Sequence, residues 1–351
     1  MRRPVFFPAL CLVFLFGGIS AGLGAVDFTS GCVRLTLHKD TGRFSFYYTP
    51  DLSGEKFDPL FVTQDPRTTF FSLISNDKTY RLGESAAFRF RLEEDGLNPS
   101  IVFESAFLRV REEFAFIKTA GSSLDNGIQI TLSLENLSPQ QVSLGLRFLV
   151  DTNLGEGVHG AAPFFTDKRP IDSETLITLN DDDRWWVSRN DKLSLMGNIS
   201  AGVERRPDLV HFANWKRLND APWKTSVSTG RNFNYLPYSI GDSAVCYYYE
   251  PRPLSRGDTL RYTILLAAED ENGFVSYGDK GKDISPPSDK TVPLSGDLPL
   301  PAGSKEADLA LLKELINRID QYVAGEISLT EEELALMETT AARLKARYGL
   351  P

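Results

Sequence analysis

The sequence predicts a mainly β protein: a large antiparallel β-sandwich, followed by a Pro-rich linker and a C-terminal α-helical hairpin. Three observations predict this order. Apolar and polar residues alternate with a period of two through most of residues 32–268, five prolines interrupt residues 278–304, and two apolar stripes of helical spacing follow. The expected divisions are a signal peptide at 1–25, a β-sandwich domain at 26–277, a Pro/Gly/Ser-rich linker at 278–304 and a helical hairpin at 305–351.

Composition limits the function classes. The chain has 351 residues, of which 42% are hydrophobic and 24% charged, enough apolar mass for a folded core. Its formal net charge is −9, which argues against electrostatic binding to nucleic acid or anionic lipid. We therefore expect no nucleic-acid partner.

The N-terminus has the pattern of a secretory signal peptide. Arg2 and Arg3 precede an apolar run, Val5–Phe16, and small residues lead to Gly24-Ala25. The run is shorter than the roughly 20 residues that span a bilayer, and no later stretch is long and apolar enough to do so. We expect cleavage near Ala25, export to the periplasm or beyond, and no transmembrane segment afterwards.

The first strands are expected as a hairpin. Val33, Leu35 and Leu37 alternate with polar residues, a turn follows at 39–42, and alternation resumes at 44–48. Such alternation indicates strands with one buried face, as in antiparallel sheets. The same pattern predicts further strands at 88–92, 128–134, 142–148, 244–250 and 259–268.

Between residues 151 and 242 strand signals are sparse, and all four tryptophans fall there. Long aromatic-rich loops on a sandwich commonly carry binding sites. Exposed indole rings can stack on sugars or on a partner protein, whereas buried ones fill a core. The candidate binding residues are Trp185, Trp186, Trp215 and Trp223.

One segment in this region suggests acid–base chemistry. Asp151, Glu156 and His159 lie in a Gly-rich stretch directly after a strong strand. They could form a carboxylate–imidazole pair for proton transfer, or hold an ordinary structured loop through side-chain hydrogen bonds. The run Asp181–Asp183 is expected to be a solvated turn. No Cys/His cluster, Gly-rich phosphate loop or HExxH motif is present, so no metal and no cofactor are expected.

Two cysteines, Cys32 and Cys246, remain after the signal peptide. They could form a disulfide in an oxidising compartment or remain separate buried thiols. The sequence leaves both alternatives open.

The C-terminal region carries two helical stripes. After Gly325, Thr330 and Glu333 form a capping box for the second helix. Both stripes have a/d spacing, which predicts an antiparallel hairpin too small to be stable without further packing. The hairpin could fold back on the sandwich or mediate self-association. The expected partner interface comprises Leu312, Ile316, Ile319, Leu334, Met337 and Leu344.

Two segments resemble a group of exported bacterial β-sandwich proteins. The stretch from Val142 to Phe164, with Asp151-Thr-Asn-Leu-Gly and Gly-Ala-Ala-Pro-Phe164, is similar to a strand-and-loop motif of that group. The stretch from Asp242 to Asp258 is similar to its closing hairpin, although His159 and Arg256 replace the usual acidic residue and proline. The resemblance implies a galactose-mutarotase-like supersandwich over roughly residues 30–270, and it assigns no catalytic residue.

Two functions are compatible with these observations. The first is an exported, non-catalytic binding or structural module of the bacterial cell envelope, with the sandwich engaging a glycan or a protein and the tail engaging a partner. The alternative is a carbohydrate-active enzyme of epimerase or lyase type that uses Asp151, Glu156 or His159. Convergence of a carboxylate with His159 in a tryptophan-lined pocket would favour the enzyme.

Overall fold

The fold was analysed in a computed structural model, which describes residues 24–50, 56–62, 66–94, 98–152, 154–156, 162–275, 316 and 319. The predicted signal peptide up to residue 23, the linker and, apart from Ile316 and Ile319, the predicted hairpin lie outside the described residues. The elements are β1 (Ala25–Ser30), β2 (Val33–His38), β3 (Arg43–Tyr48), β4 (Asp58–Pro59), β5 (Phe70–Ser75), β6 (Lys78–Arg81), β7 (Arg89–Glu93), β8 (Ser100–Glu104), β9 (Leu108–Ile117), β10 (Gly127–Asn136), β11 (Val142–Asp151), β12 (Phe164–Thr166), β13 (Pro170–Ile171), β14 (Thr175–Thr178), β15 (Trp185–Arg189), β16 (Ser194–Asn198), β17 (Leu209–Asn214), α1 (Trp215–Asp220), β18 (Ser243–Leu254) and β19 (Thr259–Ala267).

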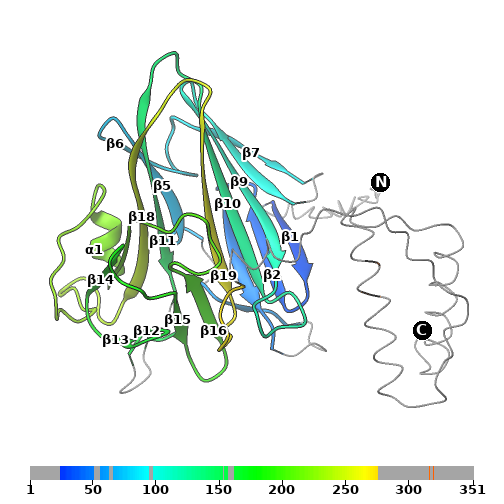
Figure 1. The fold of residues 1–351 in the computed structure, drawn as a ribbon, viewed down its shortest axis with the longest axis vertical. Coiled ribbons are helices and arrows are strands. Elements are labelled where there is room, and N and C mark those ends of the chain that lie inside the picture. The colour runs from blue at the N-terminus through cyan, green and yellow to red at the C-terminus, as the bar shows by residue number, and fades with distance from the viewer. Residues whose placement is uncertain are drawn as a thin grey trace, which may run out of the picture. The chain divides into compact units, whose positions relative to one another are not determined.

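The described strands form three antiparallel sheets, and the predicted mainly β sandwich is confirmed (Figure 1). The smallest sheet has the order β1-β2-β3-β4. The nine-stranded sheet has the order β13-β12-β15-β16-β19-β10-β9-β8-β7, and the six-stranded sheet has the order β14-β17-β18-β11-β5-β6.

One continuous core joins the three sheets. Phe44 of β3 lies between the two larger sheets: its ring centroid is 5.1 Å from that of Phe114 on β9 and 6.3 Å from that of Phe148 on β11. Phe148 in turn stacks on Phe71 of β5 at 4.1 Å. Burial of these large rings supplies much of the apolar area that stabilises the sandwich.

The predicted first hairpin is confirmed. β2 and β3 pair in register from Val33 opposite Tyr48 to His38 opposite Arg43. Gly42 closes the turn with a φ of +60°, and a Cβ there would lie 2.8 Å from the Phe90 ring. Only glycine satisfies both the left-handed backbone and the close approach.

Two short connections, residues 137–141 and 255–258, cross between sheets. β10 pairs with β19 in the nine-stranded sheet, whereas β11 pairs with β18 in the six-stranded sheet. The chain therefore changes sheet between β10 and β11, and again between β18 and β19. These crossings close the sandwich at the end where the start of β11 lies beside the end of β18. The antiparallel pairing of the two strands places the start of β18 beside the end of β11 at the opposite end.

The region between residues 151 and 242 contains more structure than its weak strand signals indicate. It contributes the short strands β12 to β17 and the helix α1, which follows directly on β17. Arg147 of β11 is buried beneath α1, and its Nη1 donates to the carbonyl oxygens of Ala221 at 3.1 Å and Trp223 at 2.9 Å. A cation at these carbonyls stabilises the C-terminal end of the helix.

Cys32 and Cys246 are free, buried thiols in this structure. Burial raises the pKa of Cys246 to about 11, so its thiol stays protonated.

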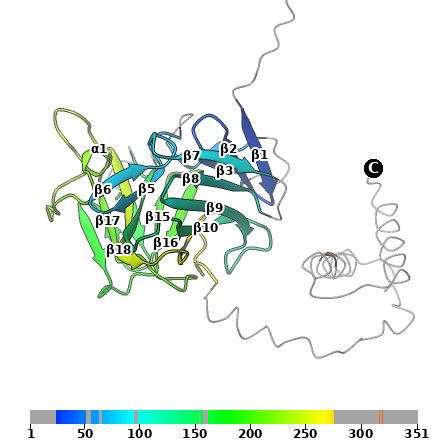
Figure 2. The same ribbon diagram turned by 90° about the horizontal axis from the view of Figure 1, so that it is seen from above.

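The chain divides into two compact units, Met1–Asp279 and Lys280–Pro351. Figure 2 shows the described strands of the first unit from above. Among the described residues, no helix is long and apolar enough to cross a membrane.

Candidate functional site

Polar residues gather at one edge of the six-stranded sheet. Asp151 ends β11 opposite Ala244 near the start of β18, and Asn214 ends β17 opposite Ser243. Because neighbouring strands are antiparallel, the ends of β11 and β17 and the start of β18 lie at the same edge.

A cluster of three carboxyl groups, Asp151, Glu156 and Asp242, lies at this edge. Glu156 Oε1 accepts hydrogen bonds from the Ser243 backbone N–H at 2.6 Å and from Ser243 Oγ at 3.0 Å. The Asp151 side chain is only 3% exposed, and its Oδ1 has no hydrogen-bond partner among the described residues. We call these three groups the carboxyl cluster.

Burial raises the pKa of all three groups of the carboxyl cluster. Burial raises the pKa of Asp151 to about 8, the nearby charges of Asp242 and Glu156 raise it further, and the Thr68 hydroxyl opposes the shift. Burial also raises the pKa of Glu156 to about 7, against the two hydrogen bonds from Ser243. Burial likewise raises the pKa of Asp242. In the described part of the chain, no group of three such side chains is arranged to hold a metal ion.

A loop with exposed apolar side chains lies next to the carboxyl cluster in the chain. Leu236, Tyr238 and Ile240 are 69%, 64% and 77% exposed, and we call them the apolar tip. Asn214 Nδ2 lies within hydrogen-bonding distance of three loop acceptors: Phe233 O at 2.8 Å, Ser239 Oγ at 2.9 Å and Asp242 O at 2.9 Å. The loop is therefore fixed at its base while its apolar side chains face solvent.

A second buried cluster anchors the preceding part of this connection. Glu174 Oε1 contacts His211 Nε2 at 3.1 Å and accepts from the Ser228 backbone N–H at 3.0 Å. Arg217 of α1 donates to Glu174 Oε2 and, at 2.9 Å, to Ser226 O. Burial lowers the pKa of His211, and Arg217 lowers it further, whereas Glu174 opposes the shift. His211 is therefore neutral at neutral pH.

The structure separates the four tryptophans. Trp185 and Trp186 are 7% and 0% exposed and fill cores, and Trp186 Nε1 donates to Tyr247 Oη at 2.5 Å. These two rings therefore have no free face to offer a ligand. Trp215 and Trp223 are partly exposed, and Trp215 Nε1 donates to Thr68 O at 3.0 Å beside the carboxyl cluster.

Of the sequence-predicted acid–base residues, the structure brings Asp151 and Glu156 to one edge together with Trp215. His159 lies outside the described residues, so the site is described without it. Asp242, Asn214 and the apolar tip are not among the site residues predicted from the sequence. The signal that could have found the tip is the segment Tyr235–Gly241, whose apolar side chains show no strand alternation and surround Pro237.

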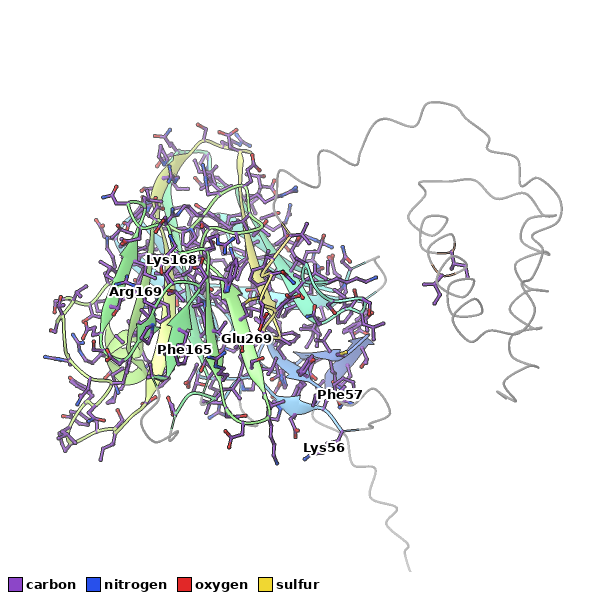
Figure 3. The ribbon with its side chains drawn as sticks, turned by 60° about the horizontal axis from the view of Figure 1, so that its bottom comes forward. Lys56, Phe57, Phe165, Lys168, Arg169 and Glu269 are labelled. Carbon is purple, nitrogen blue, oxygen red and sulfur yellow. The ribbon has the colours of Figure 1, made fainter. Side chains whose placement is uncertain are left out.

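The acidic run Asp181–Asp183 forms turn contacts. Asp181 Oδ2 accepts from the Thr178 backbone N–H at 2.8 Å, and Asp182 pairs with Lys168. Figure 3 labels Lys168 beside Arg169, which lies 3.9 Å from Asp183. Asp181 and Asp182 are engaged by protein groups at a turn, whereas Asp183 is only 3% exposed, so the expectation of a solvated turn is wrong for Asp183.

The fold and the site together define an antiparallel β-sandwich that carries a buried carboxyl cluster and an exposed loop at one sheet edge. No protein-family model matches the chain, and no curated protein matches it. Solved structures of galactose mutarotase-like proteins are similar to it at the level of the fold. A galactose mutarotase related enzyme from Lactobacillus acidophilus has 11% identity and a TM-score of 0.39, covering 71% of this chain and 98% of its own.

Two further structures show the same level of similarity. A putative aldose 1-epimerase from Escherichia coli K12 has 9% identity and a TM-score of 0.42, over 70% of this chain and 99% of that one. A galactose mutarotase-like protein from Lactobacillus casei has 9% identity and a TM-score of 0.37, over 70% and 100%. The likeness concerns the fold alone and assigns no activity to this chain.

Proposed function

We propose that this protein is an exported, non-catalytic binding module of the bacterial cell envelope, and that the apolar tip is its contact surface. The observation that carries the proposal is that the loop over residues 234–241 exposes apolar side chains while hydrogen bonds hold its base in place. Three large apolar side chains face solvent on a loop whose base is fixed by Asn214. Exposed apolar groups on a preorganised loop lose little entropy on binding and typically mark an interaction site.

The chemistry of the apolar tip favours a protein partner over a glycan. Tyr238 could stack on a sugar ring, but Leu236 and Ile240 offer aliphatic surface, which fills apolar pockets on protein partners. Lys216 lies 5.4 Å from the centroid of the Tyr238 ring and pairs with Asp220 at 2.8 Å, so this neighbouring charge is already neutralised.

The test is recovery of partners by the full-length protein from envelope extracts, together with a glycan-array screen. Tyr238→Ser should reduce partner recovery at least tenfold, which corresponds to about 1.4 kcal/mol of binding free energy. The matched control is Leu179→Ser, because Leu179 is 54% exposed and lies outside the loop. Equal binding by the wild type and Tyr238→Ser would contradict the proposal, and glycan binding lost in Tyr238→Ser would identify a sugar as the ligand.

The second candidate is a carbohydrate-active enzyme of epimerase or lyase type. The observation that favours it is the raised pKa of Asp151 and Glu156, because a general acid or base works best when its pKa is near the ambient pH. Glu156 is the more accessible of the two. Under this alternative, Glu156→Gln abolishes turnover of a sugar substrate while leaving its binding intact.

A further inference from the structure

A second group of polar side chains lies at the opposite end of β17, on the interior faces of the two larger sheets. Tyr249 of β18 and Tyr262 of β19 face each other across the core, with ring centroids 4.4 Å apart. Arg205, in the segment between β16 and β17, places its guanidinium carbon 5.8 Å from the centroid of the Tyr262 ring. Arg252 of β18 and Asp208 complete the group.

Three hydrogen-bond donors in this group are unpaired. Tyr249 and Tyr262 are 0% and 1% exposed. Among the described residues the Tyr249 hydroxyl has no hydrogen-bond partner, and the Tyr262 hydroxyl, whose oxygen faces Arg205 as a donor, has no acceptor for its own proton. The Arg252 Nε is also buried and has no partner within the described ranges. Each such group costs stability, because its hydrogen bonds to water are lost without replacement.

The acidic residue in this group does not satisfy these donors. Asp208 Oδ1 accepts from Arg252 Nη2 at 3.1 Å, and Asp208 Oδ2 accepts from the Glu250 backbone N–H at 2.8 Å. Arg205 forms no ion pair with a carboxylate in the described part of the chain. Two arginines and one aspartate leave this spot positively charged in a protein with a net charge of −9.

Both hydroxyls remain donors at neutral pH. Burial raises the pKa of Tyr249 well above its usual range. Burial also raises the pKa of Tyr262, helped by Asp208 and opposed by the charges of Arg205 and Arg252 and by a hydrogen bond from Arg205. Unpaired donors beside two guanidinium groups call for a ligand that only accepts hydrogen bonds and carries negative charge.

We propose that Tyr249, Tyr262, Arg205 and Arg252 bind a small oxyanion, the carboxylate or phosphate group of a small molecule. The two hydroxyls and Arg252 Nε donate to its oxygens, and the Arg205 guanidinium neutralises its charge. The Arg252 side chain is 42% exposed, so the group borders solvent on that side. β16 pairs with β19 only through Leu266 and Ala267, so the part of β19 that carries Tyr262 has β10 as its paired neighbour. The site is independent of the apolar tip.

The test is calorimetric titration of the full-length protein with inorganic phosphate and, separately, with acetate. We expect saturable binding of at least one anion, weakened tenfold or more in Tyr262→Phe and in Arg205→Ala. Tighter phosphate binding would assign a phosphoryl group, and tighter acetate binding a carboxylate. The matched control is Arg261→Ala, which removes an exposed arginine one residue from Tyr262 and changes the net charge equally.

A second measurement keeps the proposal falsifiable if a variant is destabilised. Tyr262→Phe removes a buried hydroxyl whose proton has no acceptor among the described residues, so without anion its midpoint of thermal unfolding should equal or exceed that of the wild type. Added phosphate or acetate should raise the wild-type midpoint and leave that of Tyr262→Phe nearly unchanged. Non-saturable binding, or equal weakening in Arg205→Ala and Arg261→Ala, would show only diffuse attraction and would overturn the proposal.

Discussion

At the scale of single residues, the carboxyl cluster couples stability to pH. The pKa values of Asp151 and Glu156 in the folded state, about 8 and about 7, lie above the values of roughly 4 expected in the unfolded chain. Between about pH 4 and pH 8, the folded state therefore binds more protons than the unfolded state. The stabilising contribution is fully present below about pH 4 and is lost as pH rises through 7 to 8.

Asp151→Asn should remove much of this dependence. Because the amide stays neutral, the variant should exceed the wild type in free energy of unfolding at pH 9 by roughly 2 kcal/mol. Urea unfolding at pH 5, 7 and 9 measures the free energy of unfolding of both proteins. In the wild type, each carboxyl group with a raised pKa changes this free energy by at most about 1.4 kcal/mol per pH unit. If the free energies of unfolding of the two proteins changed in parallel with pH, Asp151 would be ionised in the folded state at pH 5, 7 and 9, which would contradict its raised pKa.

The cluster of Glu174, His211 and Arg217 responds to acid instead. Since burial lowers the pKa of His211, the neutral ring stabilises the fold above about pH 6.5, and this contribution is lost as pH falls through the folded-state pKa. Glu174→Gln leaves Arg217 without its buried partner and should cost about 3 kcal/mol at pH 7. Chemical denaturation measures this loss, with the exposed Glu271→Gln as control. A loss no larger than that of the control would contradict the assignment.

At the scale of elements, the loop over residues 234–241 depends on Asn214. This side chain contacts three loop acceptors and also accepts from Arg217 N at 3.3 Å as the N-cap of α1. Asn214→Ala should therefore lower the free energy of unfolding by roughly 2–3 kcal/mol. It should also speed hydrogen exchange at residues 233–242 more than in β10. Unchanged exchange in the loop would mean that other contacts hold it.

The sequence identified local elements better than their arrangement. The hairpin of β2 and β3 was predictable because alternation and a glycine turn act over a few residues. The same alternation marks β10 and β11 as strands, but it says nothing about their partners, and they belong to different sheets. Strands such as β13, with two residues, and the six-residue α1 are too short to show a period.

The candidate site was predictable in part for the same reason. Asp151 and Glu156 stood out because they follow a strong strand in one continuous stretch. Asp242 joins them only through the pairing of β11 with β18, and the carboxyl pKa values follow from burial. Neither pairing nor burial at a strand end is encoded in local sequence.

At the scale of the whole molecule, we propose that the C-terminal region mediates association. Ile316 and Ile319, the two described residues there, are 50% and 48% exposed in helical backbone. Ile316→Asp and Leu344→Asp should each reduce the oligomeric mass or the recovery of an envelope partner, while the circular dichroism of the sandwich stays unchanged. Light scattering measures the mass. A monomeric wild type that recovers no partner would restrict these stripes to packing within one chain.

Export is the second proposal at this scale. Because the basic residues and apolar run at the N-terminus form a signal-peptide pattern, the mature protein should begin near Val26. N-terminal sequencing of protein from the envelope fraction measures this. An intact Met1 on cytoplasmic protein would refute it.

The central claim is that the apolar tip contacts a partner outside the cytoplasm, and site-specific photo-cross-linking in intact cells tests it most directly. A photoreactive amino acid at Tyr238 would be compared with one at Leu179, an exposed apolar position outside the loop. The account predicts a discrete cross-linked product from position 238 and none from position 179. The absence of any product at position 238, or identical products at both positions, would contradict it.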